Sequence, residues 1–136
     1  MYLVKEKINL EELLKNFDFG SGKNGSNIIF TEIVRSDEIK KGVFVSKILY
    51  DAYEPMAEKE IAKIEKEAKE KFPIDSVLIK HRVGFVDVGE ISFVVIVSSP
   101  HREEGFKAIQ FIIDEVKRKV PIWKKEILSN GETVWV

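Results

Sequence analysis

The segment Ser98–Arg102 contains two hydroxyls, an imidazole and a guanidinium within five residues. It comes just before a segment that is expected to be helical, and the first turn of a helix offers unpaired backbone N–H groups and a favourable dipole to an anion. The pattern therefore predicts a phosphate site. The sequence is equally compatible with an alternative, in which Ser99 caps the helix while His101 and Arg102 pair with Glu104 or with solvent.

A second segment, Lys117–Glu126, places five cations within nine residues, beside a proline and a tryptophan. Neighbouring positive charges favour the neutral amine of a lysine, which can act as a base or a nucleophile. If the chain is extended after Pro121, Lys124 and Lys125 point to opposite faces, so only one of them can line a given cavity. The alternative is a solvated basic helix end that complements the helix dipole.

Arginine is scarce in this chain, with four arginines against eighteen lysines. The guanidinium group is a rigid fork of donors that matches phosphate and carboxylate groups, so these few positions favour an anionic ligand. The four are Arg35, Arg82, Arg102 and Arg118. His81 is interpreted as a histidine packed at the end of a strand.

The composition limits the possible functions. With 136 residues, 44% of them hydrophobic, the chain fits a single domain spanning residues 1–136. Its 22 Lys and Arg nearly balance its 23 Asp and Glu, which argues against general binding to nucleic acid or membranes. Without cysteine, disulfides, thiolate metal sites and cysteine nucleophiles are excluded, and any sulfur chemistry must use sulfur from another molecule. No signal-peptide or membrane-spanning pattern occurs, so a cytoplasmic protein is expected.

The first elements of the chain are expected to be small. Tyr2–Lys7 predicts a short strand, and Asn9 is placed as the N-cap of a helix that runs to Lys15. Asp18–Ser26 is rich in Gly, Ser and Asn, which predicts a surface loop.

Two long helices are predicted where apolar residues recur at helical spacing. Pro55 opens the first helix, and Phe72–Pro73 ends it. The second begins near Ser99–Pro100 and ends before Pro121. The expected buried stripes are Ala57, Ile61, Ile64 and Ala68 in the first helix, and Phe106, Ile109, Ile113 and Val116 in the second.

The remaining apolar segments predict strands. Those at 27–35 and 43–50 are expected to pair with each other across a polar loop. The others lie at 76–83, 91–99, 122–127 and 133–136. Together these elements predict an α+β fold, with one mostly antiparallel sheet and two long helices packed on it, in an α/β-hammerhead-like arrangement.

The segments Ser98–Arg102 and Lys117–Glu126 lie at opposite ends of the second long helix. Arg102 and Lys117 are fifteen positions apart, which is about 22 Å along a helix axis, too far for one small ligand to touch both. We therefore expect a symmetric dimer that brings the start of one helix to the end of its mate.

The region His81–Glu126, HRVGFVDVGEISFVVIVSSPHREEGFKAIQFIIDEVKRKVPIWKKE, resembles the large, catalytic subunit of molybdopterin synthase. That family's pattern runs HRxGxxxxGExxxxVxVxSxHRxxAFxAxxxxxDxxKxxxPxWKxE. Tyr53–Glu58 and Val34–Arg35 also resemble family segments, and the resemblance covers roughly residues 27–135.

The resemblance implies an enzyme that converts cyclic pyranopterin monophosphate into molybdopterin by installing two dithiolene sulfurs. It implies that the sulfur comes from the thiocarboxylated C-terminal glycine of a small ubiquitin-like subunit. The implied assembly is a heterotetramer, with a homodimer of large subunits at its centre. No cofactor and no metal are expected.

The resemblance also assigns roles to residues of this chain. Lys117 and Lys124 match lysines implicated in catalysis, with proton transfer and charge stabilisation as their expected roles. His101 and Arg102 match a pair that lines the substrate pocket. Two further positions are Arg35, which matches a strand-end arginine facing substrate phosphate or the incoming tail, and Glu126, which is expected to orient Lys124 or to form only a salt bridge with it.

The chain departs from the family pattern at a few positions. Glu32 stands where members usually have glycine, three positions before Arg35, and the loop after Arg35 differs as well. The chain ends at Val136, so a basic tail residue that some relatives contribute is expected to be missing. These departures leave open an alternative function, a non-catalytic paralogue that binds the small subunit or a pterin as a scaffold or regulator. A generic small-ligand-binding α+β domain is a further alternative.

Overall fold

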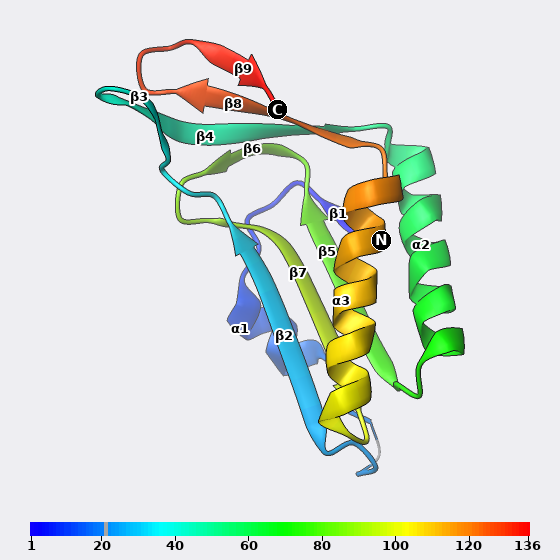
Figure 1. Cartoon of the computed structure of the whole chain (residues 1–136). Coiled ribbons are helices and arrows are strands. Elements are labelled where there is room, and N and C mark those ends of the chain that lie inside the picture. Colours follow the sequence, from blue (N-terminus) through cyan, green and yellow to red (C-terminus); the bar gives the residue numbers. More distant parts are fainter. Residues whose placement is uncertain (21) are drawn as a thin grey trace.

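The computed structural model describes residues 1–20 and 22–136, and in it the strands form two sheets (Figure 1). The first sheet has the order β1-β5-β7-β2, and the second has the order β3-β4-β8-β9, with β6 also paired with β4. In Figure 1 the second sheet lies across one end of the first. The strand bounds are β1 (Leu3–Val4), β2 (Ser26–Ile33), β3 (Glu38–Lys40), β4 (Val43–Ala52), β5 (Ser76–Arg82), β6 (Gly84–Asp87), β7 (Ile91–Ser99), β8 (Ile122–Leu128) and β9 (Thr133–Trp135).

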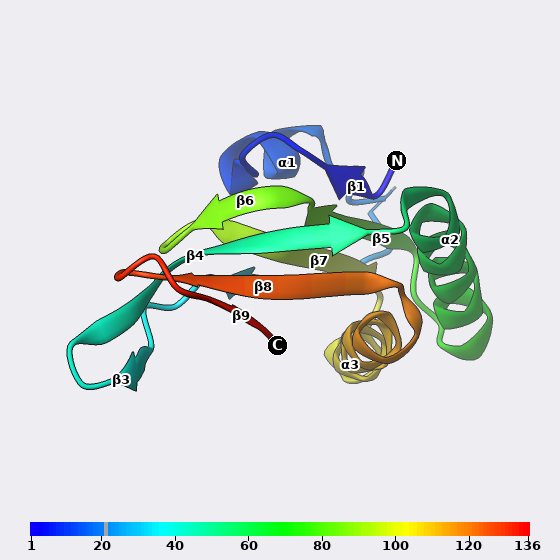
Figure 2. The same ribbon diagram turned by 90° about the horizontal axis from the view of Figure 1, so that it is seen from above.

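The predicted α+β class, with mostly antiparallel strands and two long helices on one face, is confirmed. All strand pairs are antiparallel except β1 with β5. The helices α2 (Glu54–Lys71) and α3 (Arg102–Lys119) lie side by side on the same face of the first sheet (Figures 1 and 2). Between them and the sheet lies the main core, to which β7 contributes Phe93, Val95 and Val97.

The buried stripe of α2 was predicted correctly, whereas that of α3 was partly wrong. Ala57, Ile61, Ile64 and Ala68 are all buried. In α3, Phe106 is 57% exposed and Ile113 is only half-buried. The buried residues of α3 are Gly105, Ala108, Ile109, Ile112, Glu115 and Val116. The helix turns small residues toward the sheet because a Cβ at Gly105 would lie only 2.8 Å from the Ser99 hydroxyl.

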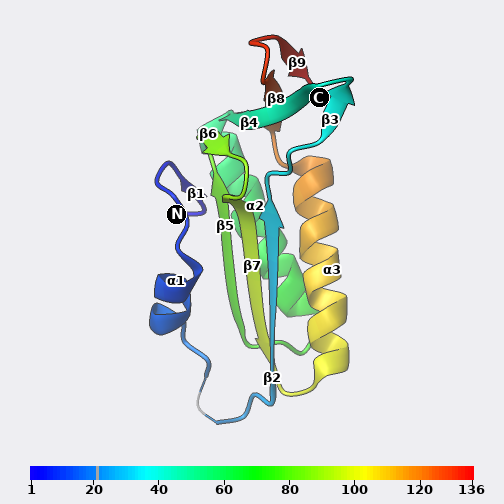
Figure 3. The same cartoon turned by 90° about the vertical axis from the view of Figure 1, so that its left-hand side faces the viewer.

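The short helix α1 (Leu10–Asn16) covers the opposite face of the first sheet (Figure 3). Asn9 caps it as predicted, because its side chain accepts a hydrogen bond from the Glu12 backbone N–H. Leu13 and Leu14 pack near Val94 and Ile96 of β7, so that strand is buried on both sides. The predicted loop 18–26 has no regular structure at residues 18–20 and 22–25, and Ser21 lies outside the described residues.

The predicted strand pairing and the single sheet were wrong. The strands predicted at 27–35 and 43–50 belong to different sheets: β2 pairs with β7, and β4 pairs with β3, β6 and β8. Two short strands were also missed, β3 inside the predicted polar loop and β6 beside Gly84. The tail strands β8 and β9 form as expected, and they extend the second sheet.

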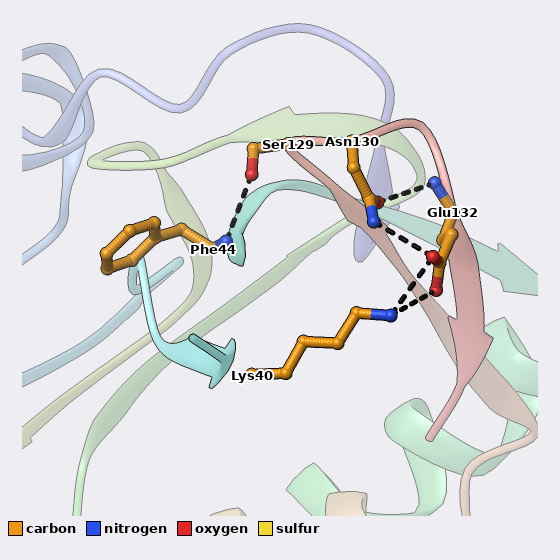
Figure 4. A network of polar contacts seen from close by, with 5 residues as sticks. All are labelled: Lys40, Phe44, Ser129, Asn130 and Glu132. Carbon is orange, nitrogen blue, oxygen red and sulfur yellow. Dashed lines mark hydrogen bonds and ion pairs between the residues drawn. The ribbon is translucent and has the colours of Figure 1, made fainter. Parts of the chain in front are cut away.

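The far end of the second sheet is held by a polar network (Figure 4). The Lys40 ammonium contacts both carboxylate oxygens of Glu132 at 3.1 Å, and this cation lowers the pKa of Glu132. The Asn130 amide donates to the same carboxylate, and the Phe44 N–H donates to the Ser129 hydroxyl. These contacts join β3 and the start of β4 to the β8–β9 turn, and so fix how β8 lies beside β4.

Candidate active site

The described residues form two adjoining cavities where the sheets meet the C-terminal end of α3. The inner cavity has a volume of about 280 Å³ and the outer cavity about 550 Å³. The residues that line both are Glu32, Tyr50, Lys117 and Lys124. The inner cavity is completed by His81, Phe93, Val116, Val120, Ile122, Trp123 and Val136, and the outer one by Phe30, Thr31, Ile33, Val34, Arg35, Asp37, Ile48 and Glu126.

Strand register explains why these side chains gather. Glu32 of β2 lies opposite Phe93 of β7, which in turn lies opposite His81 of β5, so the three form a row across the first sheet. In the second sheet Tyr50 of β4 lies opposite Lys124 of β8. The two rows approach each other beside Lys117, in the last turn of α3.

Lys117 reaches from α3 to the first sheet. Its Nζ lies 2.6 Å from Glu32 Oε2 and 5.9 Å from the centre of the Phe93 ring. The Lys117 side chain is 50% exposed, so a ligand can reach the ammonium group from the cavities.

Lys124 and Lys125 lie on opposite faces of β8, as the alternation of a strand predicted. Lys124 lines both cavities, whereas the Lys125 ammonium lies 5.1 Å from the centre of the Trp135 ring of β9. Glu126 shares the face of Lys124 and lines the outer cavity. Within the described part of the chain no ion pair joins Glu126 to Lys124, so the predicted contact between them is not formed in the single subunit.

The other two cations of the predicted cluster belong to a surface ion-pair network. Arg118 and Lys119 both pair with the Glu115 carboxylate, and their hydrogen bonds and charges lower the pKa of Glu115. Of the five cations of Lys117–Lys125, Lys117 and Lys124 therefore lie at the cavities, and the other three make contacts elsewhere.

Arg35 lies in the wall of the outer cavity with an exposed side chain, and it pairs with Asp37 at 3.2 Å. Arg82 does not have the anion-binding role that was considered for the arginines. Its guanidinium is buried, donates to the Phe85 carbonyl and lies 3.5 Å from Glu90, so it holds the β5–β6–β7 region together.

His101 and Arg102 lie at the opposite end of α3 from Lys117, exposed and outside both cavities. His101 rather than Ser99 is the N-cap residue, so the alternative in which Ser99 caps the helix was wrong on this point. The hydroxyls of Ser98 and Ser99 are buried and donate to Asn27 and to the His101 carbonyl. Of the predicted phosphate site, only the imidazole and the guanidinium therefore remain accessible to a ligand.

His81 is a buried strand-end histidine, as interpreted, but it also lines the inner cavity. Burial is the main reason that its pKa falls from 6.5 to about 4, with Lys117 and Lys124 lowering it further. Its Nδ1 lies 2.8 Å from the Arg82 carbonyl oxygen, a contact that only a protonated Nδ1 can make as a hydrogen bond. The imidazole is therefore neutral near pH 7, with its Nε2 lone pair free of a proton.

Sequence reasoning missed Tyr50, Phe93 and Trp123 as cavity residues, and it noted Glu32 only as a departure. A signal for Glu32 was available, since Ile28, Phe30 and Glu32 alternate onto the core-facing side of β2. A carboxylate in such a row needs a cationic partner. No comparable signal marks Tyr50.

The site offers cations to an anionic ligand and aromatic walls to a planar one. The described residues contain no group of three or more His, Cys, Asp or Glu side chains that could hold a metal ion. None of the helices in the described chain combines the length and the apolar character that a membrane crossing requires.

Comparison with known proteins assigns a family. The family model described as MoaE protein matches residues 3–119. A molybdopterin synthase catalytic subunit of Pyrococcus abyssi is 43% identical over 136 residues, covering 98% of this chain and 88% of the relative. A crystal structure of molybdopterin synthase from Staphylococcus aureus superposes with a TM-score of 0.86 at 38% identity, covering 99% of this chain and 95% of that one.

A second structure shares the fold at lower identity. It is a complex of subunits 1 and 2 of molybdopterin-converting factor from Helicobacter pylori, with a TM-score of 0.77 and 22% identity over 99% of this chain and 88% of that one. The match to the family model covers more than half of the chain, and the identity to the P. abyssi subunit extends over 98% of it. The chain therefore belongs to the MoaE protein family, that of the molybdopterin synthase catalytic subunits.

Proposed function

We propose that this chain is the catalytic subunit of a molybdopterin synthase and that sulfur transfer to cyclic pyranopterin monophosphate takes place at the two cavities beside Lys117 and Lys124. The observation that carries the proposal is the meeting of these two lysines, from the end of α3 and from β8, at the same two cavities. The similarity to catalytic subunits does not favour the alternative of a non-catalytic scaffold.

The sulfur donor is proposed to be the thiocarboxylated C-terminal glycine of a small ubiquitin-like subunit. The H. pylori structure of the same fold contains two subunits of molybdopterin-converting factor, in line with such a partner. The absence of cysteine from this chain fits a reaction in which the sulfur arrives on another protein.

In each transfer the thiocarboxylate sulfur bonds to a carbon of the pterin side chain and displaces the oxygen substituent that this carbon carries, which gives a thioester between the partner and the pterin. Water then attacks the thioester carbon and breaks its bond to sulfur, so the sulfur stays on the pterin and a carboxylate is left on the partner. Lys117 and Lys124 are proposed to stabilise the oxyanion that develops at the thiocarboxylate carbon and to move the proton from water. The neutral His81 adds a hydrogen-bond acceptor at the wall of the inner cavity.

The substrate phosphate needs cations beyond these two lysines. Arg35 lies in the outer cavity wall, and His101 and Arg102 are proposed to come from the second copy in a homodimer. This proposal supplies the missing end of the site, because a single α3 holds Arg102 and Lys117 at its two ends. The homodimer would form the centre of a heterotetramer with two small subunits.

The test is to mix the protein with thiocarboxylated small subunit and cyclic pyranopterin monophosphate and to detect dithiolene product as its fluorescent oxidised derivative. We expect product with the thiocarboxylated partner and none with the carboxylate form of that partner. If the complete mixture yields no product although the subunits form a complex, the proposed function is wrong.

A further inference from the structure

Glu32 holds a position in the site that the proposed reaction does not use. Its carboxylate is the ion-pair partner of Lys117, with Oε2 at 2.6 Å from Nζ, and it lines both cavities. It is also the position at which the chain departs from the glycine of the family pattern. A carboxylate thus already occupies the place beside Lys117 where a ligand anion would bind.

The backbone of β2 directs the Glu32 side chain toward Lys117. Glu32 lies opposite Phe93 in the antiparallel β2–β7 pair, and the register shifts directly after it, between Glu32 and Ile33. The hydroxyl of the fully buried Ser92 donates to the Glu32 carbonyl at 3.2 Å. Because Phe30 and Phe93 pack in the core on the same side, the Glu32 side chain must project toward the end of α3.

The positive and negative charges of the side chains that line the outer cavity balance each other. Three cations face three carboxylates: Arg35, Lys117 and Lys124 against Glu32, Asp37 and Glu126. Two of the cations already have intramolecular partners, Lys117 with Glu32 and Arg35 with Asp37. An entering anion therefore meets no net positive charge until it displaces one of these carboxylates.

Glu32 is the carboxylate best placed to be displaced from a catalytic cation. Its side chain is 29% exposed and that of Lys117 is 50% exposed, so water and ligand can reach the pair and the two groups can separate without opening the core. Exposed and half-exposed ion pairs contribute little free energy, so little is lost when a ligand anion replaces Glu32 beside Lys117.

We propose that Glu32 is a displaceable counter-ion, which pairs with Lys117 at the position of a ligand anion and moves away from it when a ligand oxyanion binds. The inference rests on the proposed function, since it concerns the same site. The displacing oxyanion has two possible sources, the C-terminal carboxylate of the partner's tail and the phosphate of the substrate. Glu32 acts in either case as a positioning residue that sets how strongly the site binds anions.

The experiment measures binding to the isolated full-length subunit by calorimetry, with two probes: sodium phosphate and a synthetic peptide that ends in a glycine carboxylate. Glu32→Gln removes the charge and keeps the side-chain shape. We expect at least one probe to bind about twofold to fivefold more tightly to Glu32→Gln than to the wild type. The probe that gains affinity identifies the source of the oxyanion.

Two controls make the result specific. Glu126→Gln removes the same charge from the same cavity, from a carboxylate that is not paired with Lys117, and is expected to raise probe affinity less than Glu32→Gln does. In the double variant Glu32→Gln with Lys117→Ala, the gain is expected to disappear. Equal or weaker binding by Glu32→Gln, no binding of either probe to it, an equal gain in Glu126→Gln or a gain that survives Lys117→Ala would each overturn the inference.

These binding data are independent of sulfur transfer. A subunit that shows the Glu32 effect but forms no dithiolene product would refute the proposed function and leave the counter-ion in place. A subunit that forms product but shows no gain in anion affinity in Glu32→Gln would support the proposed function and refute the counter-ion role of Glu32.

Discussion

The ring of Tyr50 stands edge-on to the imidazole of His81, with the ring centroids 5.1 Å apart. Tyr50 belongs to β4 of the second sheet and His81 to β5 of the first, so this buried pair joins the two sheets directly beneath the cavities. The His81 ring also lies 5.2 Å from that of Phe93. The floor of the candidate site is therefore also a structural contact between the two halves of the fold.

Removing the Tyr50 ring is expected to destabilise the whole molecule. Tyr50→Ala leaves a cavity between the sheets and should lower the free energy of unfolding by about 3–5 kcal/mol, the range for large aromatic side chains in cores. Tyr50→Phe keeps the ring and should cost no more than about 1.5 kcal/mol. Urea denaturation of both variants checks this, and a loss below about 1 kcal/mol for Tyr50→Ala would show that the ring pair does not hold the sheets together.

Replacing either candidate catalytic lysine should abolish most of the product formation. Lys117→Ala and Lys124→Ala are each expected to reduce kcat about 10²-fold to 10⁴-fold, because each removes a proton donor or a stabilising charge at the cavities. Lys125→Ala is the matched control, since Lys125 is adjacent in sequence but faces Trp135 on the other side of β8. Near wild-type turnover of Lys117→Ala or Lys124→Ala would mean that the residue in question is not catalytic.

The helical parts of the fold were predictable where most apolar residues of a helix lie on one face. In α2 the four stripe residues recur at helical spacing and all are buried, whereas the two other apolar residues after Pro55, Met56 and Ala62, are exposed. In α3 apolar residues surround more of the helix, so periodicity alone could not show that Gly105 and Ala108 face the sheet while Phe106 faces outward. The close approach of α3 to the first sheet, rather than hydrophobicity, determines that Gly105 and Ala108 face the sheet.

Strand pairing and the contacts of the site could not be predicted in the same way. Alternation assigns faces within one strand, and it placed Lys124 and Lys125 correctly. It does not specify which strand pairs with which, so the separation of β2 and β4 into two sheets was missed. The Glu32–Lys117 contact depends on that tertiary arrangement, because it joins a strand and a helix far apart in the sequence.

The stability of the protein should fall as the pH is lowered, in a way that depends on His81. In the unfolded chain the imidazole takes up a proton as the pH falls through about 6.5, whereas in the folded chain burial lowers its pKa to about 4. Between these values the unfolded state binds more protons, so the free energy of unfolding decreases with decreasing pH by up to roughly 3 kcal/mol. The full contribution is present above about pH 6.5 and is lost by about pH 4.

Thermal or urea unfolding between pH 7 and pH 4.5 measures this effect. Carboxylates contribute to the same slope, so the informative quantity is the difference between the wild type and His81→Gln, whose slope should be shallower. His101→Gln removes the exposed histidine and should keep the wild-type slope. Identical slopes for the wild type and His81→Gln would refute a buried neutral His81.

A site shared between two subunits predicts that inactive variants rescue each other. Arg102 and Lys117 occupy the two ends of one α3, so in the proposed dimer each site takes Lys117 from one copy and Arg102 from the other. Lys117→Ala and Arg102→Ala subunits should each be nearly inactive alone. In a random mixture half of the dimers are mixed, and each mixed dimer contains one intact site and one doubly altered site. Co-expression should therefore restore about a quarter of the wild-type turnover.

Mixing Lys117→Ala with Lys124→Ala, which lie at the same cavities of one chain, should restore none, because every site then lacks one lysine. Failure of the first mixture, with mixed dimers present by native mass spectrometry, would place the whole site within one subunit.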